Sequence, residues 1–139
     1  MPSFKVQVAN IHKVGPVTEI LISQSFQYLK ATGNQQKFVK LLAMIDTGAS
    51  GTVIREGIAE ELGIKPIGEV FMNTPSSVNH RCFQYDIQML FPNNIGISSC
   101  IVSEAPLKNQ HIQCLIGRDI LQQSIFIYSG LDNSFTICF

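Results

Sequence analysis

The sequence contains Ala43-Met44-Ile45-Asp46-Thr47-Gly48-Ala49-Ser50, an apolar run that leads directly into an acid and then into small residues. This pattern predicts a buried strand that delivers the carboxylate of Asp46 to a fixed place at its end. Thr47 can hydrogen-bond nearby backbone or carboxylate oxygens, and Gly48, which has no Cβ, lets another segment approach closely. The alternative is a plain turn, because Asp and Gly are both favoured turn residues.

A second stretch favours the functional interpretation over the plain turn. It is Cys114-Leu115-Ile116-Gly117-Arg118-Asp119-Ile120-Leu121, in which apolar residues again lead into a glycine and then into a short segment of helical character. We therefore expect two buried strands that each end in a glycine-containing loop.

Alternation of apolar and polar residues predicts that strands dominate the rest of the chain. The expected strands cover residues 4–8, 17–29, 37–45, 83–91, 95–103, 125–128 and 135–139. Two short helices are expected over residues 55–62, closed by Gly63, and over residues 118–123. No repeat or linker interrupts the pattern, so we expect one all-β domain over residues 1–139.

The composition limits the classes of partner. The chain has 139 residues, of which 45% are hydrophobic and 14% are charged, so it is expected to fold around a core. Ten Lys and Arg residues balance ten Asp and Glu residues, which leaves no overall field to hold nucleic acid or an anionic membrane. A polar surface with so little charge favours an oligomer.

Targeting signals and metal-binding patterns are not found in the sequence. There is no secretory signal and no apolar run long enough to span a bilayer, so we expect a cytoplasmic protein. The four cysteines form no C-x-x-C pair, and no histidine lies at ligand spacing from them. We expect buried thiols, no metal and no organic cofactor.

In their order along roughly residues 17–139, the segments Ile45-Asp46-Thr47-Gly48-Ala49 and Leu115-Ile116-Gly117-Arg118-Asp119-Ile120-Leu121, followed by a terminal strand, resemble a retropepsin. Retropepsins are single-domain, homodimeric aspartic proteases. The resemblance implies a closed acid-protease barrel with a flap hairpin, and an aspartic endopeptidase that cleaves extended polypeptides. It implies catalysis by Asp46, support of the active-site loop by Thr47, Gly48, Ile116, Gly117 and Arg118, and a dimer sheet built from Phe135, Thr136, Ile137, Cys138 and Phe139.

Hydrolysis of an amide by carboxylates explains why a dimer is expected. One carboxyl group must accept a proton from a water while another donates a hydrogen bond, and two that lie close together share one proton, as in aspartic proteases. The sequence contains Asp-Thr-Gly only once, at Asp46. A two-fold axis between two chains supplies the second copy.

The end of the chain suggests where the dimer forms. Phe135, Ile137 and Phe139 would expose an apolar strand edge that no later residue covers, and a partner strand would remove that hazard. The alternative is that this strand pairs inside its own sheet.

The flap is expected over residues 70–85, because retropepsins cover bound substrate with a β-hairpin. Substrate contacts are expected from its tip, at Thr74, Pro75, Ser76, Ser77, Val78 and Asn79, and from Ala49 and Ser50 on the floor. The tip departs from the retropepsin pattern because no glycine lies between Gly68 and Gly96.

A second departure is Ser50, where retroviral members commonly have an acid that pairs with the arginine of the second loop. A buried Arg118 then needs another partner, and Glu56, Glu104 or a neighbouring chain are the candidates. The alternative is that Arg118 is exposed on a helix.

Two other functions were weighed. Gly48-Ala49-Ser50-Gly51-Thr52 lacks the last glycine of a serine-hydrolase elbow. A catalytically silent retropepsin-like module that binds peptides or dimerises is the stronger rival. Catalysis is preferred, since a binding module has no need of a costly carboxylate pair.

Overall fold

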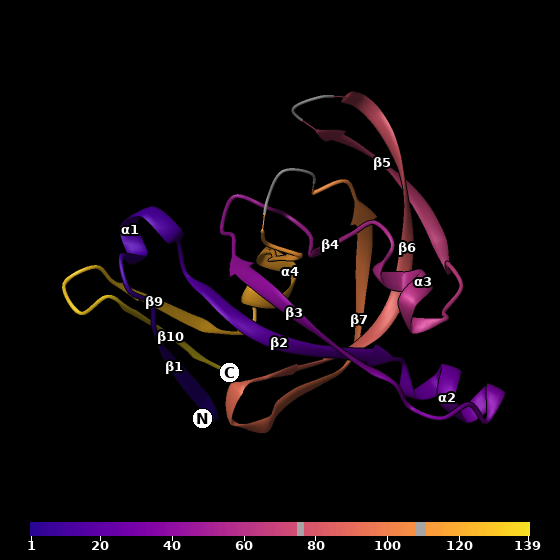
Figure 1. Ribbon diagram of the computed structural model, residues 1–139, viewed down its shortest axis with the longest axis horizontal. Helices are drawn as coiled ribbons and strands as arrows, with labels where there is room; N and C mark the ends of the chain where they lie inside the picture. Colours follow the sequence, from indigo (N-terminus) through magenta and orange to yellow (C-terminus); the bar gives the residue numbers. More distant parts are fainter. Residues whose placement is uncertain (75–76, 108–110) are drawn as a thin grey trace.

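A computed structural model describes residues 1–74, 77–107 and 111–139, and shows a closed β-barrel beside a smaller sheet (Figure 1). The strands are β1 (Ser3–Gln7), β2 (Val17–Gln24), β3 (Phe38–Ile45), β4 (Val53–Arg55), β5 (Gly68–Thr74), β6 (Ser77–Phe91), β7 (Ile95–Ala105), β8 (Cys114–Ile116), β9 (Ile125–Ser129) and β10 (Ser134–Cys138). The helices are α1 (Ile11–Val14), α2 (Phe26–Thr32), α3 (Ile58–Leu62) and α4 (Arg118–Leu121), with a 3-10 turn η1 (Pro92–Asn94).

Six strands form the barrel in the order β2-β3-β8-β4-β7-β6, and pairing of β2 with β6 closes it. The predicted all-β class and closed barrel are confirmed. The β3–β8 and β4–β7 pairs are parallel, while their neighbours are antiparallel. Because parallel strands run in the same direction, β3 and β8 deliver the residues that follow them to one edge of the barrel.

The barrel is filled by the inward faces of these strands. Alternate residues of β2 and β3 are buried, and so are the first and last residues of β8. Burial of each such side chain contributes about 1.5–3 kcal/mol relative to exposure. The most completely buried positions include Ile20, Ile22, Leu41, Ala43, Ile87, Val102, Cys114 and Ile116.

The smaller sheet has the order β1-β10-β9, and it corrects the prediction made for the terminal strand. β10 pairs with β1 along one edge and with β9 along the other, so it offers no free edge to a partner. Phe135 and Ile137 are fully buried in their own chain, and the Phe135 ring packs against Phe4 and Phe126 with ring centroids 6.3 Å and 6.1 Å away. The alternative, pairing inside its own sheet, is confirmed.

The helices show a second difference from the sequence prediction. α3 and α4 occupy the two predicted helical segments, and Gly63 closes α3 with a φ of 70°. α1 and α2 were not predicted, and α2 replaces the end of the strand expected over residues 17–29. Its start is fixed by the Ser25 side chain, which accepts a hydrogen bond from Tyr28 N, and its end by Gly33 in the left-handed region.

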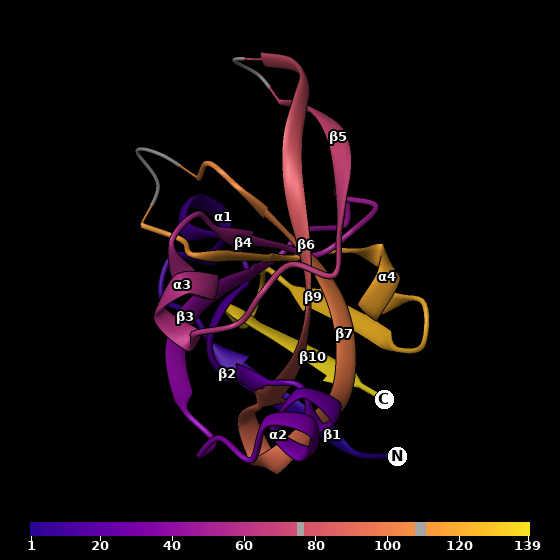
Figure 2. The ribbon, with the colours of Figure 1, turned by 90° about the vertical axis from the view of Figure 1, so that its right-hand side faces the viewer.

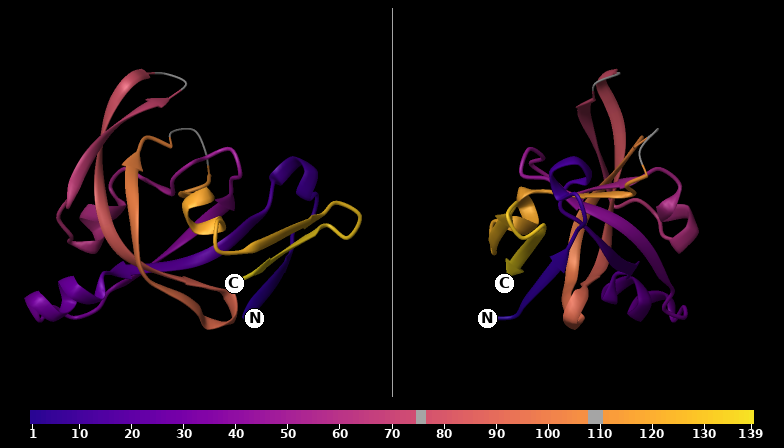
Figure 3. Two further views of the ribbon diagram at one scale, coloured as in Figure 1. Left: turned by 180° about the vertical axis from the view of Figure 1, so that it is seen from behind. Right: turned by 60° about the vertical axis from the view of Figure 1, so that its left-hand side comes forward.

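The hairpin formed by β5 and β6 extends well beyond the barrel (Figure 2). Seen from behind, the two chain termini lie near each other beside the smaller sheet, as the pairing of β1 with β10 requires (Figure 3). No helix in the described part of the chain combines the length and apolar character needed to cross a membrane.

Replacement of Phe135 by alanine tests the internal position of β10. We expect a loss of about 3–5 kcal/mol in the free energy of unfolding, measured with chemical denaturant, because the substitution leaves a cavity in the core. Leu131→Ala is the control, because Leu131 is 99% exposed and its truncation should change stability by about 0.5 kcal/mol or less. Equal, small effects of the two substitutions would contradict the position of β10.

Candidate active site

Asp46 follows β3 directly, and its main chain is fixed from both sides. Asp46 N donates to Ile116 O at 2.9 Å, which continues the parallel pairing of β3 with β8. One residue earlier, Ile45 N donates to Pro16 O at 3.0 Å. The acid is therefore carried on a strand that is held on both edges, and its position does not depend on a mobile loop.

A tight turn holds the carboxylate itself. Gly48 N donates to Asp46 Oδ1 at 2.9 Å, and Ala49 N donates to Asp46 O at 3.2 Å. A Cβ on Gly48 would lie 3.1 Å from the same Oδ1, so the residue at this position must be small. Asp46 is half-buried, and no hydrogen bond from another described residue reaches its Oδ2. That oxygen is available to a water or a substrate.

Arg118 braces the turn from the second loop. Arg118 N donates to Ala49 O at 2.9 Å, and Arg118 Nη1 donates to Thr47 O at 2.7 Å. The partner of the Arg118 side chain, which the sequence did not identify, is therefore the backbone carbonyl of Thr47 in the Asp46 loop. Because the side chain is exposed, the guanidinium avoids the cost of a buried unpaired charge.

Gly117 is required by the close crossing of the two loops. A Cβ at this position would lie 2.5 Å from both the carbonyl carbon and the oxygen of Gly51, a distance that real Cβ atoms essentially never show. Its backbone is extended, so the demand comes from space and not from φ. The glycine of the second loop therefore sets how near the two loops can approach.

Asp119 and Thr52 form a clamp that the sequence analysis missed. Thr52 N and Thr52 Oγ1 donate to the two carboxylate oxygens of Asp119 at 3.1 Å and 2.8 Å, and Ile120 N donates to Asp119 Oδ1 at 2.9 Å. Thr52 Oγ1 also accepts from Gly117 N at 3.1 Å. Thr52 is 1% exposed, so these bonds satisfy a buried polar side chain. A threonine opening the apolar run 52–54 was the available signal.

The structure brings most of the predicted site residues together. The two crossing loops contain Thr47, Gly48 and Gly117, with Ala49 and Ser50 in the same turn as Thr47. Ile116 ends β8 beside the Asp46 loop, and Arg118 begins α4 and bonds to that loop. The backbones of Thr74, Ser77, Val78 and Asn79 belong to the β5–β6 hairpin, whereas Pro75 and Ser76 lie outside the described residues. Phe135, Thr136, Ile137, Cys138 and Phe139 lie in or beside the internal strand β10 and take no part in the crossing of the loops.

The cysteines are poorly suited to nucleophilic chemistry. All four are free. Burial, with a smaller effect of Asp119, raises the pKa of the Cys100 thiol to about 12, and burial raises the pKa of Cys114 as well. These thiols stay protonated at neutral pH, and a protonated thiol is a weak nucleophile.

Gly117→Ala tests the loop crossing. We expect a loss of about 1–3 kcal/mol in the free energy of unfolding, because the added methyl group must displace the backbone of Gly51. Gly51→Ala is the matched control: its Cβ would meet nothing within 4 Å, and a change of about 0.5 kcal/mol or less is expected. If both variants melt like the wild type in a calorimeter, the loops do not cross as closely as described.

The chain was compared with models of known protein families, with curated proteins and with solved structures. The sequence model of the family described as gag-polyprotein putative aspartyl protease matches residues 30–123, which include both loops. No curated protein matches the sequence.

Solved structures that share the fold include the two that follow, and they confirm that the predicted barrel is retropepsin-like. One is a retropepsin-like aspartic protease from Rickettsia conorii, with 18% identity and a TM-score of 0.51 over 87% of this chain and 90% of that one. The other is the retroviral protease-like domain of Ddi1 from Leishmania major, with 15% identity and a TM-score of 0.50 over 88% of both chains.

Proposed function

The chain belongs to the family of gag-polyprotein putative aspartyl proteases, and from that premise we propose that it is an aspartic endopeptidase that acts as a homodimer. The observation that supports this most directly is the state of the Asp46 carboxylate. One oxygen accepts the Gly48 N–H at 2.9 Å, and the other has no partner among the described residues. A carboxylate oriented in this way can hold a water.

Under this proposal, the reaction is general acid–base hydrolysis of a peptide bond. One ionised Asp46 accepts a proton from a water as the water oxygen bonds to the carbonyl carbon. The partner's Asp46, which is protonated, donates a hydrogen bond to the carbonyl oxygen and stabilises the tetrahedral intermediate. The C–N bond then breaks, and the leaving nitrogen takes up a proton. No metal or organic cofactor enters these steps.

The braces around Asp46 would contribute by preorganisation. A catalytic carboxylate is effective when its supporting shell holds it near the reactive geometry, so that little reorganisation is needed during the reaction. Arg118 and the Asp119–Thr52 clamp hold the loop through bonds of 2.7–3.1 Å. Their proposed role is to position the acid without contacting the substrate.

We propose that the β5–β6 hairpin is the flap. It projects past the barrel, and a hairpin in that position can exclude water from a bound peptide (Figure 2). An extended substrate would pair its backbone with strand edges while alternate side chains fill pockets. The backbone segments around Thr74, Ser77, Val78 and Asn79 remain the predicted contacts.

The dimer must use another edge than the predicted one, and we propose the edge of β9. The two edge strands of the smaller sheet are β1 and β9. β1 exposes Lys5, which would face its own copy across a two-fold axis, whereas β9 exposes the uncharged Ile125, Ile127 and Tyr128. An uncharged apolar edge is self-complementary, and a partner strand removes its aggregation hazard. α4 joins the braced loop to β9. Pairing of β9 with β9 of a second chain would therefore place the Asp46 loops of the two chains about one two-fold axis.

We also propose that residues 1–139 form a single domain. The main hydrophobic core contains Phe4, Phe135 and Ile137 of the smaller sheet together with Ile20 and Leu41 of the barrel. A shared core of this kind makes the two sheets one folding unit.

Asp46→Asn tests catalysis directly. We expect cleavage of a peptide library, assayed from acidic to neutral pH, to fall by at least about a thousandfold, because the amide can no longer accept a proton from the water. The fold should be unchanged, as judged by circular dichroism. Equal cutting by wild type and variant would contradict catalysis by Asp46, and cutting by neither would favour the silent binding module.

Ile127→Asp tests the proposed dimer edge. Two buried aspartates facing each other should weaken the dimer at least about a hundredfold, because charges at such an interface lose their hydration without gaining a partner. Sedimentation equilibrium gives the dissociation constant, and Lys5→Glu on β1 is the control that should leave it unchanged. The opposite outcome, with dimers kept by the first variant and lost in the second, assigns the interface to β1.

A further inference from the structure

Among the residues that the structure describes, no backbone pairing joins the outer half of the β5–β6 hairpin to the barrel. β6 pairs with β7 only from Gln84 onward and with β2 only from Ile87 to Leu90. From Ser77 to Phe83, its pairing is with β5 alone, and β5 has no second neighbour. Side-chain contacts must therefore set how this half of the hairpin lies relative to the barrel.

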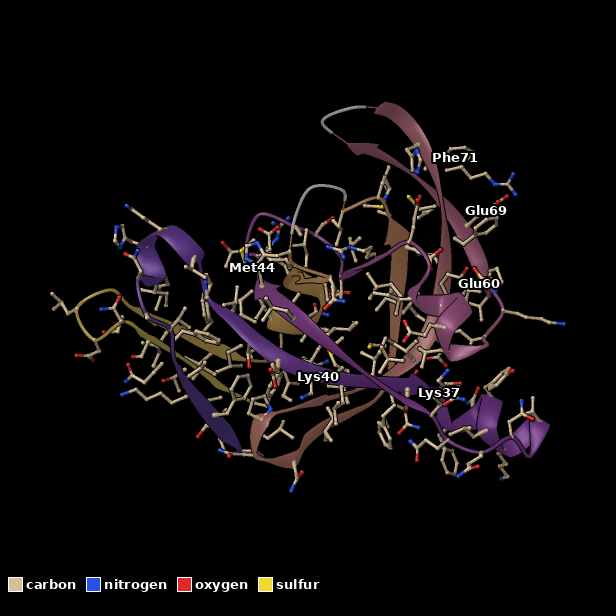
Figure 4. The ribbon with its side chains drawn as sticks, in the orientation of Figure 1. Lys37, Lys40, Met44, Glu60, Glu69 and Phe71 are labelled. Carbon is tan, nitrogen blue, oxygen red and sulfur yellow. The ribbon has the colours of Figure 1, made fainter. Side chains whose placement is uncertain are left out.

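The register of the hairpin sorts its side chains into two faces. The pairs Glu69↔Phe83 and Phe71↔Arg81 define one face, and Figure 4 shows Glu69 and Phe71 on the side that points away from the barrel. There Arg81 forms an ion pair with Glu69 and lies over the Phe83 ring at 5.1 Å from its centroid. These contacts stiffen the hairpin, but they do not connect it to anything else.

The other face, defined by the pairs Val70↔Cys82 and Met72↔His80, turns toward the barrel. Val70, Met72 and Cys82 join a small apolar cluster with Val53, Ala105 and Leu115. Beyond this cluster, His80 Nε2 lies 3.6 Å from Glu56 Oε1. Among the ion pairs between described residues, this is the one that links the hairpin to the body of the protein.

The backbone of Glu56 is held in place by the barrel. It directly follows β4, and its N–H donates to Ala105 O on β7 at 3.1 Å. β4 in turn begins next to Thr52, which Asp119 clamps. A contact between His80 and Glu56 therefore relates the hairpin to the strand that leaves the Asp46 loop.

The remaining charged and titratable groups near His80 are acids and a thiol. Glu104 on β7 accepts from Ala59 N at 3.2 Å, and burial raises the pKa of its carboxyl group. Burial, Glu56 and Glu104 together raise the pKa of the Cys82 thiol, whose Sγ donates to His80 O at 3.7 Å. Arg81 and Glu69 lie on the opposite face of the hairpin. The cation next to Glu56 along the chain is Arg55, whose Nη2 donates to Ile112 O at 3.0 Å.

We propose that His80 is a positioning residue: its protonated imidazole pairs with Glu56 and holds the hairpin at a set height above the Asp46 loop. The effect on substrate binding rests on the proposed protease function, whereas the effect on the hairpin does not. An ion pair of this kind requires a protonated imidazole, and histidine is the side chain whose charge changes between about pH 5 and 8. We therefore expect the contact to hold the hairpin more tightly at pH 5.5 than at pH 8.

Hydrogen–deuterium exchange of residues 68–83 tests the contact without any catalysis. After correction for the intrinsic pH dependence, wild-type exchange should be about two- to fivefold slower at pH 5.5 than at pH 8, the size expected for a partly exposed ion pair. His80→Gln and Glu56→Gln should both exchange at the faster rate at either pH. His12→Gln, on α1, and Glu69→Gln, on the outer face, are the matched controls that should keep the pH dependence.

His80→Arg supplies a positive test, because arginine stays charged at both pH values. This variant should show slow exchange at pH 8 as well as at pH 5.5. If wild-type exchange is the same at both pH values, or if His12→Gln removes the difference as His80→Gln does, the proposal is overturned.

Peptide cleavage separates this proposal from the proposed function. At pH 5.5, His80→Gln should raise KM about two- to fivefold with kcat unchanged, and at pH 8 it should match the wild type. If the hairpin responds to pH but the protein cleaves no peptide, the positioning role of His80 stands and the proposed protease function is wrong. If the protein cleaves peptides but His80→Gln has the wild-type KM at every pH, the protease function stands and the positioning role of His80 is wrong.

Discussion

The close crossing of the loops that leave β3 and β8 is the constraint on which the rest of the site depends. Gly117 lies against the backbone of Gly51 so closely that no Cβ fits between them. That approach lets Asp46 N reach Ile116 O, lets Arg118 hold the turn from the other side, and brings the Asp119 carboxylate to Thr52. Because the residues that meet are 65–71 positions apart in the sequence, the fold must form before the carboxylate is placed.

The same crossing explains why one chain supplies only part of the proposed centre. Asp46 is placed by its own chain, but the chemistry requires a second carboxyl group that shares a proton with the first. α4 is short, and it carries the bracing residues at one end and leads to the edge strand β9 at the other. In the proposed dimer, the partner would therefore be held by the same element that holds the acid. The hairpin stands apart from this rigid unit, and the His80–Glu56 contact would connect the two.

Local patterns in the sequence predicted most of the strands and the two glycine loops, because alternation of polarity and the positions of glycine act over a few residues. The closed barrel was predicted from the resemblance to retropepsins. They failed where long-range pairing decided the outcome. The segment from Phe26 to Leu29, in which only Gln27 is polar, continues the strand pattern, but Ser25 and Gly33 supply helix caps that override it. Phe135 and Ile137 suggested an open edge, since nothing in the local sequence reveals that β1, more than a hundred residues earlier, covers it. Similarly, Asp119 showed no signal of its own until its distance to Thr52 was known.

Mixing active and inactive subunits tests most directly whether two copies of Asp46 form one centre. Wild-type chain is combined with increasing amounts of Asp46→Asn chain, allowed to exchange subunits, and assayed for peptide cleavage per wild-type chain. A shared centre predicts that this specific activity falls in proportion to the wild-type fraction, because mixed dimers contain only one carboxylate. Specific activity that stays constant at every ratio would mean that each chain cleaves alone, and it would contradict the shared centre.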